Sequence, residues 1–300
     1  MKKNTSNEQS PTPPESILQL LQIVAGDTSL GSDFSQAWVI REFQPGEDLN
    51  GDSNDNDNFL YLIRQGQVCL WGFDATLGRE VSTQLLLEAQ TFGGEHLFDH
   101  QTLPYRAIAA SAGCVAQIAI SDLKQCLNRI PNLESDLQLF TYQQQALIFF
   151  KTHTKLRSLS NSTLEELLSY LVAMKITTGS SLREATAPAQ GRFWLAGGRI
   201  DNSEQIGDSW IYPDVTLSDA IAQTNVLVYH LSIEHSESVK AITPDLFPQQ
   251  PETAQRKNLP IIQIPLPVPG ITEQPDYSKI DFYESGNQPK SKAKVWTNYL

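Results

Sequence analysis

The chain is poor in cysteine and has no long apolar run. Its 300 residues include three cysteines, Cys69, Cys114 and Cys126, and no two of them form a Cys-x-x-Cys pair. An odd, scattered set of this kind predicts the reduced thiols of a cytoplasmic protein rather than a disulfide framework. No apolar stretch is long enough to cross a membrane. The charged first residues are not followed by the apolar segment of a signal peptide.

Basic residues are also scarce. The chain has 22 Lys and Arg against 34 Asp and Glu, for a net charge of −12. From Glu252 onward six basic and five acidic residues nearly balance, so the acidic excess lies in the folded part. A broad nucleic-acid-binding surface should be basic, so we expect no nucleic-acid partner. A single anion pocket is still allowed, because a local field can oppose the sign of the net charge.

The first half of the chain predicts short strands between two helical regions. Residues 1–15 are polar and proline-containing, which predicts disorder, and residues 16–25 carry an apolar stripe typical of a helix. Strand-like runs separated by turn signals follow at residues 38–43, 59–63, 68–73, 81–87 and 107–120. This spacing favours a mainly β fold with flanking helices, of the β-sandwich or jelly-roll (β-roll) type.

Residues 121–160 turn helical. Pro131 fits a helix start, and residues 146–150, Ala-Leu-Ile-Phe-Phe, are apolar on every side of a helix. A helical segment that is apolar all round is buried between other elements. We therefore predict a connector helix that packs either between two domains or at the interface of a homodimer.

The second half of the chain repeats the first. Residues 107–133 align without gaps with residues 220–246, and seven of these positions are identical. Upstream, residues 43–46 correspond to 176–179 and residues 59–66 to 192–198, so both copies have a turn glycine at matching places. The order of strand, turn and terminal helix agrees as well. An internal duplication is the best account, which predicts one domain over 16–150 and a second copy over 151–247.

Residues 248–300 differ in composition from both copies. They contain eight of the 17 prolines. Such a stretch favours extended, semi-rigid conformations over a packed domain. We predict a proline-rich linker or tail.

Residues 92–111 carry most of the functional information. Gly93 and Gly94 let the backbone approach a ligand closely, and the amides of the short helical stretch after them favour an anion. Arg106 could neutralise a phosphate through paired donors, and Glu95 could accept a hydrogen bond from a sugar hydroxyl. The alternatives are a surface arginine paired with a carboxylate such as Asp99, and a glutamate favoured by the helix dipole.

This segment resembles the phosphate-binding cassette of the cyclic-nucleotide-binding domain family, which reads roughly Phe-Gly-Glu, a short helix, then Arg-Ala. The resemblance implies that Glu95 binds the ribose 2′-hydroxyl and Arg106 the cyclic phosphate. Gly93 and Gly94 with the amides of His96 and Leu97 would complete the cradle, and Ala107 matches the small residue after the arginine. The implied ligand is cyclic AMP or cyclic GMP.

The cassette departs from the family pattern at one end. Tyr105 separates Pro104 from Arg106, where the family has an adjacent Pro-Arg pair, and the stretch from Glu95 to Arg106 is one or two residues longer than usual. The loop is therefore remodelled for another nucleotide, or it no longer binds any; both alternatives stay open.

The second copy lacks the cassette. From Gly66 to Ala107 the chain advances 41 positions, whereas from Gly198 to Ala220 it advances 22. The missing length corresponds to a hairpin and the cassette. We predict a degenerate domain that does not bind a cyclic nucleotide.

The chain gives no sign of catalysis or of a metal site. His96 and His100 are four residues apart and could share a metal on a helix, but they have no evident third ligand. No Gly-x-Ser-x-Gly motif and no nucleophile–base pair is visible. We predict a protein that is not an enzyme and has no cofactor or metal.

Three functions compete on this basis. The first is a sensory, regulatory module in which a cyclic nucleotide orders residues 93–106 and repacks the connector helix. The second is a ligand-free scaffold for protein interactions. The third, a transcription factor of the cyclic-AMP receptor type, ranks low because no basic recognition helix is visible. The tandem arrangement, the cassette and the proline-rich tail also resemble the N-terminal regulatory region of cyanobacterial peptidase-containing ABC exporters, which implies an exporter or peptidase partner reached through the tail.

Overall fold

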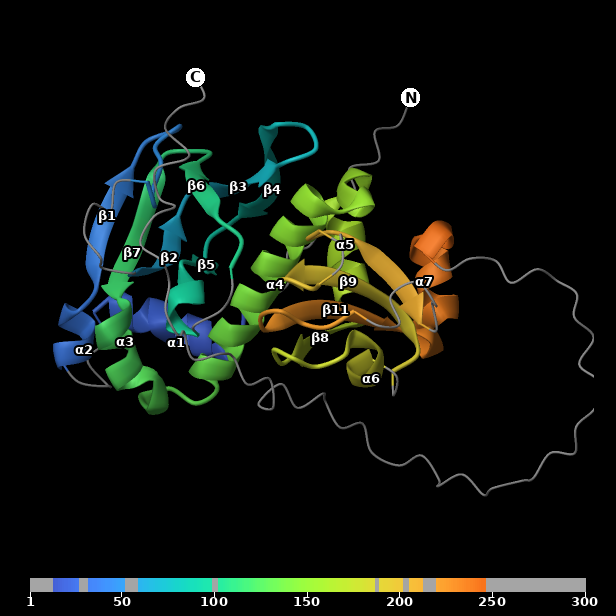
Figure 1. Ribbon diagram of the computed structural model, residues 1–300. Helices are drawn as coiled ribbons and strands as arrows, with labels where there is room; N and C mark the ends of the chain where they lie inside the picture. Colours follow the sequence, from blue (N-terminus) through green and yellow to red (C-terminus); the bar gives the residue numbers. More distant parts are fainter. Residues whose placement is uncertain are drawn as a thin grey trace, which may run out of the picture.

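The computed structural model describes residues 13–26, 32–51, 59–98, 102–186, 189–201, 205–212 and 220–246. Two β-rich units lie on either side of one long helix, α4 (Figure 1). The tail predicted over 248–300 lies outside the described residues. The segment predicted to be disordered, residues 1–15, also lies outside them up to residue 12. Its last residue, Glu15, begins the first helix.

The first unit is a roll of two antiparallel sheets. One sheet has the strand order β1-β7-β2-β5 and the other β4-β3-β6. Side chains such as Phe43, Ile63 and Leu70 fill the space between them. The elements are α1 (Glu15–Val24), α2 (Ser32–Gln36), β1 (Val39–Phe43), β2 (Phe59–Gln65), β3 (Val68–Asp74), β4 (Arg79–Leu86), β5 (Thr91–Phe92), the 3-10 helix η1 (Gly94–Leu97), β6 (Tyr105–Ala109) and β7 (Gly113–Ala119).

The mainly β fold with flanking helices is confirmed, with one strand boundary wrong. The run 107–120, expected as one strand, divides into β6 and β7, which belong to different sheets. The chain reverses between them because the amides of Ala110 and Ser111 both donate to the carbonyl of Gln67. Gly113 then starts β7 so close to Gln65 that a Cβ would overlap the Gln65 carbonyl oxygen.

The connector is α3 (Ile120–Cys126), the 3-10 helix η2 (Leu127–Arg129), α4 (Leu133–His153) and the 3-10 helix η3 (Lys155–Ser158). The two halves of α4 pack into different hydrophobic cores. Leu133 and Leu137 pack with α1 in the first unit, whereas Phe149 and Phe150 pack with residues of the second unit such as Trp194. Residues 146–150 are at most 1% exposed, so of the two alternatives for this segment, burial between two units of one chain is what the structure has.

The second unit has one four-stranded antiparallel sheet, of order β10-β9-β11-β8. Its inner face packs on the second half of α4 together with α5 and α7. The elements are α5 (Asn161–Leu168), β8 (Leu171–Ile176), α6 (Leu182–Thr186), β9 (Gly191–Gly197), β10 (Ser209–Tyr212), β11 (Val226–Ser232), the 3-10 helix η4 (Ile233–His235), α7 (Ser236–Ile242) and the 3-10 helix η5 (Pro244–Leu246).

The sheet of the second unit parallels the larger sheet of the first. Strands β8, β11, β9 and β10 follow one another as β1, β7, β2 and β5 do. In the first unit the Gly46 amide donates to the Ala109 carbonyl over 2.8 Å; in the second the Gly179 amide donates to the Ala222 carbonyl over 2.7 Å. Gly66 and Gly198, at φ +92° and +88°, both close a turn against the start of a neighbouring strand, β7 for Gly66 and β11 for Gly198. In the described part of the second unit, the three-stranded sheet is reduced to two isolated bridges, Ser181–Ile221 and Ile200–Ala222.

No helix in the described part of the chain is both long and apolar enough to cross a membrane.

Candidate functional site: a closed cassette

The glycine pair of the cassette is shaped by packing inside the protein. Gly93 follows β5 at φ +82°, and a Cβ there would overlap the carbonyl oxygen of Phe59 on β2. A Cβ on Gly94 would meet the hydroxyl of Thr141 on α4 at 2.5 Å. Both positions therefore need glycine so that the turn can fit between β2 and α4.

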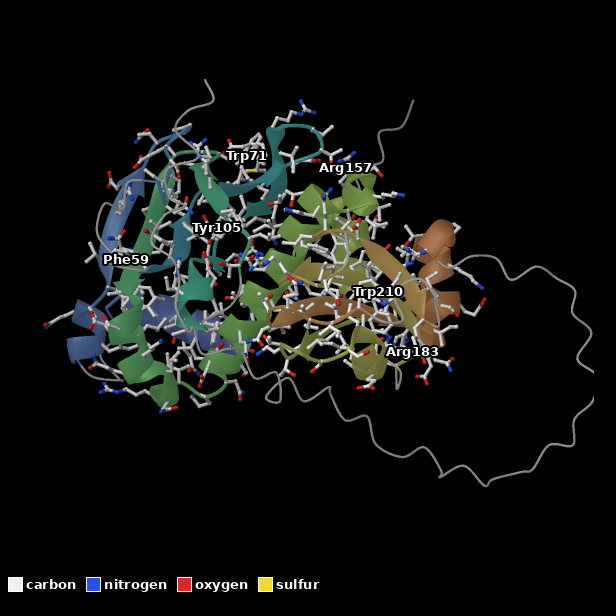
Figure 2. The ribbon with its side chains drawn as sticks, viewed as in Figure 1. Phe59, Trp71, Tyr105, Arg157, Arg183 and Trp210 are labelled. Carbon is white, nitrogen blue, oxygen red and sulfur yellow. The ribbon has the colours of Figure 1, made fainter. Side chains whose placement is uncertain are left out.

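Tyr105 fills the space next to this turn. Its hydroxyl accepts a hydrogen bond from the Gly93 amide over 3.0 Å and donates one to the Glu95 carboxylate over 3.2 Å. Figure 2 labels Tyr105 within the first unit, between the two sheets. The phenol thus occupies the Glu95 carboxylate, which the family resemblance assigns to the ribose, and the amide of Gly93 in the glycine turn of the cassette.

Glu95 is a buried carboxylate. It is 8% exposed, and its second oxygen lies 3.9 Å from Nε2 of the exposed His96. Burial raises the pKa of Glu95, and the charge of His96 and the Tyr105 hydroxyl partly oppose this shift. Burial, followed by the nearby Glu95 charge, holds the pKa of Tyr105 well above its ordinary value. Tyr105 is therefore a neutral hydrogen-bond donor at this site.

Arg106 points away from Glu95. Its side chain is 51% exposed and makes two ion pairs, from Nε to Asp48 at 2.7 Å and from Nη1 to Glu80 at 3.1 Å. The hydrogen bond that Arg106 donates to Asp48, with the charges of both carboxylates, raises the pKa of Arg106. Successive side chains of a strand face opposite sides of the sheet, so Arg106 cannot face the interior while Tyr105 and Ala107 do.

Ala107 lies in the core of the first unit, fully buried. Its amide donates to Oδ1 of Asn50 over 2.8 Å, and the Asn50 amide group donates to the Tyr105 carbonyl over 3.2 Å. Asn50 therefore holds the backbone on both sides of Arg106. A change of register that turned Arg106 inward would break both bonds and move every side chain of β6 to the opposite face.

Side chains of α4 hold the backbone around the cassette. Gln144 donates from its amide group to the carbonyl of Thr91 in β5. Gln145 accepts from the Leu103 amide over 2.8 Å, just before β6. With Thr141 beside Gly94, three residues of one helix contact the segments that enter and leave the cassette.

The expected site is thus brought together only in part. Gly93, Gly94, Glu95, Leu97 and Ala107 are buried around the turn, whereas His96 and Arg106 are exposed. The expectation that Arg106 faces Glu95 is not met by the structure. Of the two alternatives for Arg106, an ion-paired surface arginine fits the geometry, although its partners are Asp48 and Glu80; Asp99 lies outside the described residues. Sequence reasoning missed Tyr105 and the polar residues of α4.

The described residues contain no group of three or more His, Cys, Asp or Glu side chains placed to hold a metal ion. His100, paired with His96 in the sequence analysis, lies outside the described part.

Comparison with known proteins identifies the type of the first unit. Residues 40–130 match the family model for the cyclic nucleotide-binding domain. This span runs from β1 to the end of the 3-10 helix after α3 and includes the whole cassette. Residues 40–130 therefore form a domain of the cyclic nucleotide-binding type, with the jelly-roll fold of that family. The search of curated proteins finds no match.

Solved structures that resemble the chain include several regulators. One is the N-terminal domain of a transcriptional regulator from Streptomyces coelicolor A3(2), at 20% identity over 39% of this chain and 86% of that one, with a TM-score of 0.29. The c-di-GMP responsive regulator CLP of Xanthomonas campestris has 15% identity over 52% and 70%, with a TM-score of 0.36. The regulatory domain of Toxoplasma gondii PKA, solved with cAMP, has 14% identity over 77% and 95%, with a TM-score of 0.30.

Proposed function

We propose that the chain is a non-enzymatic regulatory module whose cassette is closed by its own Tyr105, so that it works through protein contacts rather than through a bound cyclic nucleotide. One observation carries this proposal. The Tyr105 hydroxyl takes both the Gly93 amide and the Glu95 carboxylate, while the one arginine of the cassette is committed to Asp48 and Glu80 on the opposite face of β6.

In this proposal the second unit is a degenerate copy of the first and serves as a docking partner for α4. Its strand order, its turn glycines and its backbone hydrogen bonds at the places aligned by sequence all support a duplication. The reduction of the three-stranded sheet to two bridges agrees with the shorter spacing between Gly198 and Ala220. A unit without a cassette has nothing with which to bind a nucleotide.

The helix α4 is the connection through which the module would act. Its middle contacts the cassette through Thr141, Gln144 and Gln145. The next turn, residues 146–150, is buried against the second unit. A displacement of the cassette would therefore be carried along a rigid helix into the second unit.

A second candidate function is a sensor for a cyclic nucleotide or a related phosphodiester, reached when Tyr105 leaves the cassette. The observation that favours it is the pair of groups under the phenol. A backbone donor at Gly93 and a buried acceptor at Glu95 stay in place for a ligand with one anionic and one hydroxyl group. In this case Glu95, and not Arg106, is the residue on which binding depends.

Calorimetric titration of the full chain with cyclic AMP and cyclic GMP separates these functions. The variants are Glu95→Gln and Arg106→Ala, with Arg41→Ala as a control because Arg41 is also ion-paired in the first unit, to Glu47. The closed module gives no heat with either nucleotide in any protein. Binding that is lost in Glu95→Gln but kept in Arg106→Ala supports the sensor. Binding that is lost in Arg106→Ala but kept in Arg41→Ala contradicts the closed cassette outright.

We further propose, on the resemblance given above alone, that the module regulates a membrane exporter or peptidase reached through residues 248–300. Gel filtration of the full chain and of residues 13–246 with the purified cytoplasmic parts of such an exporter tests this. Co-elution of the full chain only is the expected result. Separate elution of both proteins would contradict it.

A further inference from the structure

Two segments, one from the first unit and one from the connector, meet at the end of α4. One is the hairpin tip between β3 and β4, residues 75–78, all exposed, with Leu77 48% exposed. The other is η3, which contains no buried residue. The exposed hairpin tip has no apolar packing of its own, whereas Leu156 of η3 packs, partly buried, against the core of the second unit. Another interaction must fix the hairpin tip.

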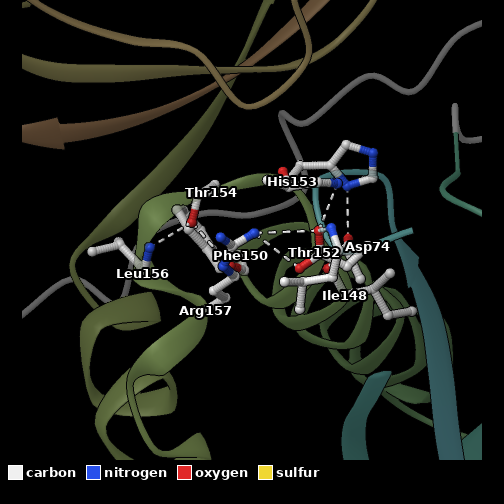
Figure 3. Close-up of polar contacts among 10 residues, drawn as sticks. Asp74, Ile148, Phe150, Thr152, His153, Thr154, Leu156 and Arg157 are labelled. Carbon is white, nitrogen blue, oxygen red and sulfur yellow. Dashed lines mark hydrogen bonds and ion pairs between the residues drawn. The ribbon is translucent and has the colours of Figure 1, made fainter. Parts of the chain in front are cut away.

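Asp74 and Arg157 supply that interaction. The Asp74 side chain is fully buried at the end of β3, and its Oδ1 accepts from the amides of Thr76 at 2.8 Å and Leu77 at 3.0 Å. Nη1 of Arg157 in η3 donates to both carboxylate oxygens, at 3.3 and 3.0 Å. Figure 3 shows this pair, and Figure 2 places Arg157 beside the hairpin.

The surroundings let the hairpin approach α4 closely. A Cβ on Gly72 of β3 would meet the methyl group of Thr152 at 2.8 Å, so only glycine allows this contact. Thr152 in turn bonds to the carbonyl of Ile148 and to Nδ1 of His153 (Figure 3). On the side of the second unit, a Cβ on Gly207 would overlap the His153 carbonyl oxygen. The ion pair thus lies where hairpin, connector and second unit converge.

We propose that the Asp74–Arg157 pair is a releasable latch that couples the first unit to the end of the connector. Closed, it fixes the hairpin tip on η3. When it opens, the hairpin lifts, both ions reach water together, and neither core loses a buried apolar side chain. A buried charge is destabilising chiefly when its partner leaves and it stays behind; an opening that hydrates both avoids that cost. The latch acts separately from the cassette and does not depend on whether a nucleotide binds.

Hydrogen exchange measured by mass spectrometry on the full chain tests the latch. The variants are Arg157→Gln, Asp74→Asn and the double variant. Arg106→Gln is the matched control, because Arg106 is also an ion-paired arginine, but it and both of its partners, Asp48 and Glu80, lie in the first unit. We expect exchange to rise about tenfold in peptides covering residues 74–79 and 154–159 of Arg157→Gln, with β2, β7, β9 and β11 as in the wild type. The double variant should exchange no faster than the worse single variant. Arg157→Lys should restore part of the protection, because it keeps the charge but not the paired donors.

Three results would overturn the latch. Unchanged hydrogen exchange in Arg157→Gln means that the ion pair does not hold the hairpin tip on η3. An equal rise over all strands, in Arg157→Gln and Arg157→Lys alike, means that the pair is a general support of the fold. The same local rise in Arg106→Gln means that the effect is one of net charge. Nucleotide titration stays as in the wild type in each case, so a failure of the latch is distinguishable from a failure of the closed cassette.

Discussion

The two β-units share a frame, the four-stranded sheet with its turn glycines, and differ in the elements added to that frame. Both have a four-stranded antiparallel sheet of the same order, with turn glycines at matching places. The first unit adds a three-stranded sheet and the cassette, whereas the described second unit adds neither. What both keep is the contact with α4. Because the second unit packs on α4 without a cassette, the joining of the two units does not need a nucleotide site.

The comparison also bears on the cassette itself. In the first unit the glycine turn is kept, but its amide and its glutamate are satisfied by Tyr105. The glycines are explained by the closeness of Phe59 and Thr141, and the arginine by Asp48 and Glu80. Glu95, the two glycines and Arg106 thus each have contacts inside the protein that account for them, which agrees with the proposal of a closed cassette.

The connector gives the largest expected effect. Phe150→Ala should destabilise the chain by about 3–5 kcal/mol, the usual cost of emptying a buried aromatic site, since Phe150 is fully buried against Trp194 and Tyr229. Calorimetric unfolding is the measurement. We expect the single transition of the wild type to divide into two, with the second unit melting first. Leu137→Ala, in the half of α4 that packs on the first unit, is the counterpart. If Phe150→Ala lowered the melting temperatures of both units equally, the two units would not have separate cores.

The turn glycines sharpen the comparison between the two copies. Gly66→Ala and Gly198→Ala each force a side chain into positive φ and against the start of a neighbouring strand, β7 or β11. We expect each to cost about 2 kcal/mol or more, as strained turn positions do. Gly46→Ala and Gly179→Ala, at similar φ but with open space around the added Cβ, should cost about 1 kcal/mol. Chemical denaturation of the four variants measures this. Unequal costs within either matched pair would argue against a shared frame.

The connector and the second unit each contain a partly buried histidine, His153 in α4 and His230 in β11, which predicts a dependence on pH. Burial lowers the pKa of His153 and of His230 below the ordinary 6.5. The unfolded chain then binds these protons more readily than the folded one, so the stabilisation present above about pH 6.5 is lost as the pH falls below that value. The melting temperature should fall as the pH is lowered from about 7.5 to about 5.5. The fall should be smaller in His230→Gln than in the wild type. His96→Gln, an exposed histidine, is the control. A profile unchanged in His230→Gln would remove that residue from the explanation.

The smallest expected effect concerns Arg106. Because its side chain is half exposed and its carboxylate partners are on the surface, Arg106→Gln should cost less than about 1 kcal/mol. The effect should shrink further at high salt. Urea denaturation at low and high salt measures both. A cost several times larger would mean that Arg106 supports the interior of the first unit.

Much of the frame could be predicted from the sequence, because apolar periodicity determines it. The helix at 16–25, the strands from residue 38 to 87 and the buried segment 146–150 follow from such patterns. The orientation of the Arg106 side chain could also have been predicted from the sequence. Ala107 and Ala109 are the small apolar residues of that strand, and strand alternation places Arg106 opposite to them. The bridge made by Tyr105 could not, since it joins β6 to a turn ten residues away. Nor could the roles of Gln144 and Gln145, which look like surface residues of a helix.

The most direct test of the closed cassette is a crystal structure of residues 13–246 soaked with cyclic AMP. The account predicts no nucleotide in the first unit, with the Tyr105 hydroxyl still within hydrogen-bond distance of the Gly93 amide and of Glu95, and with Arg106 still on Asp48. A nucleotide bound beside Glu95, with Tyr105 displaced and its phosphate on Arg106, would contradict it.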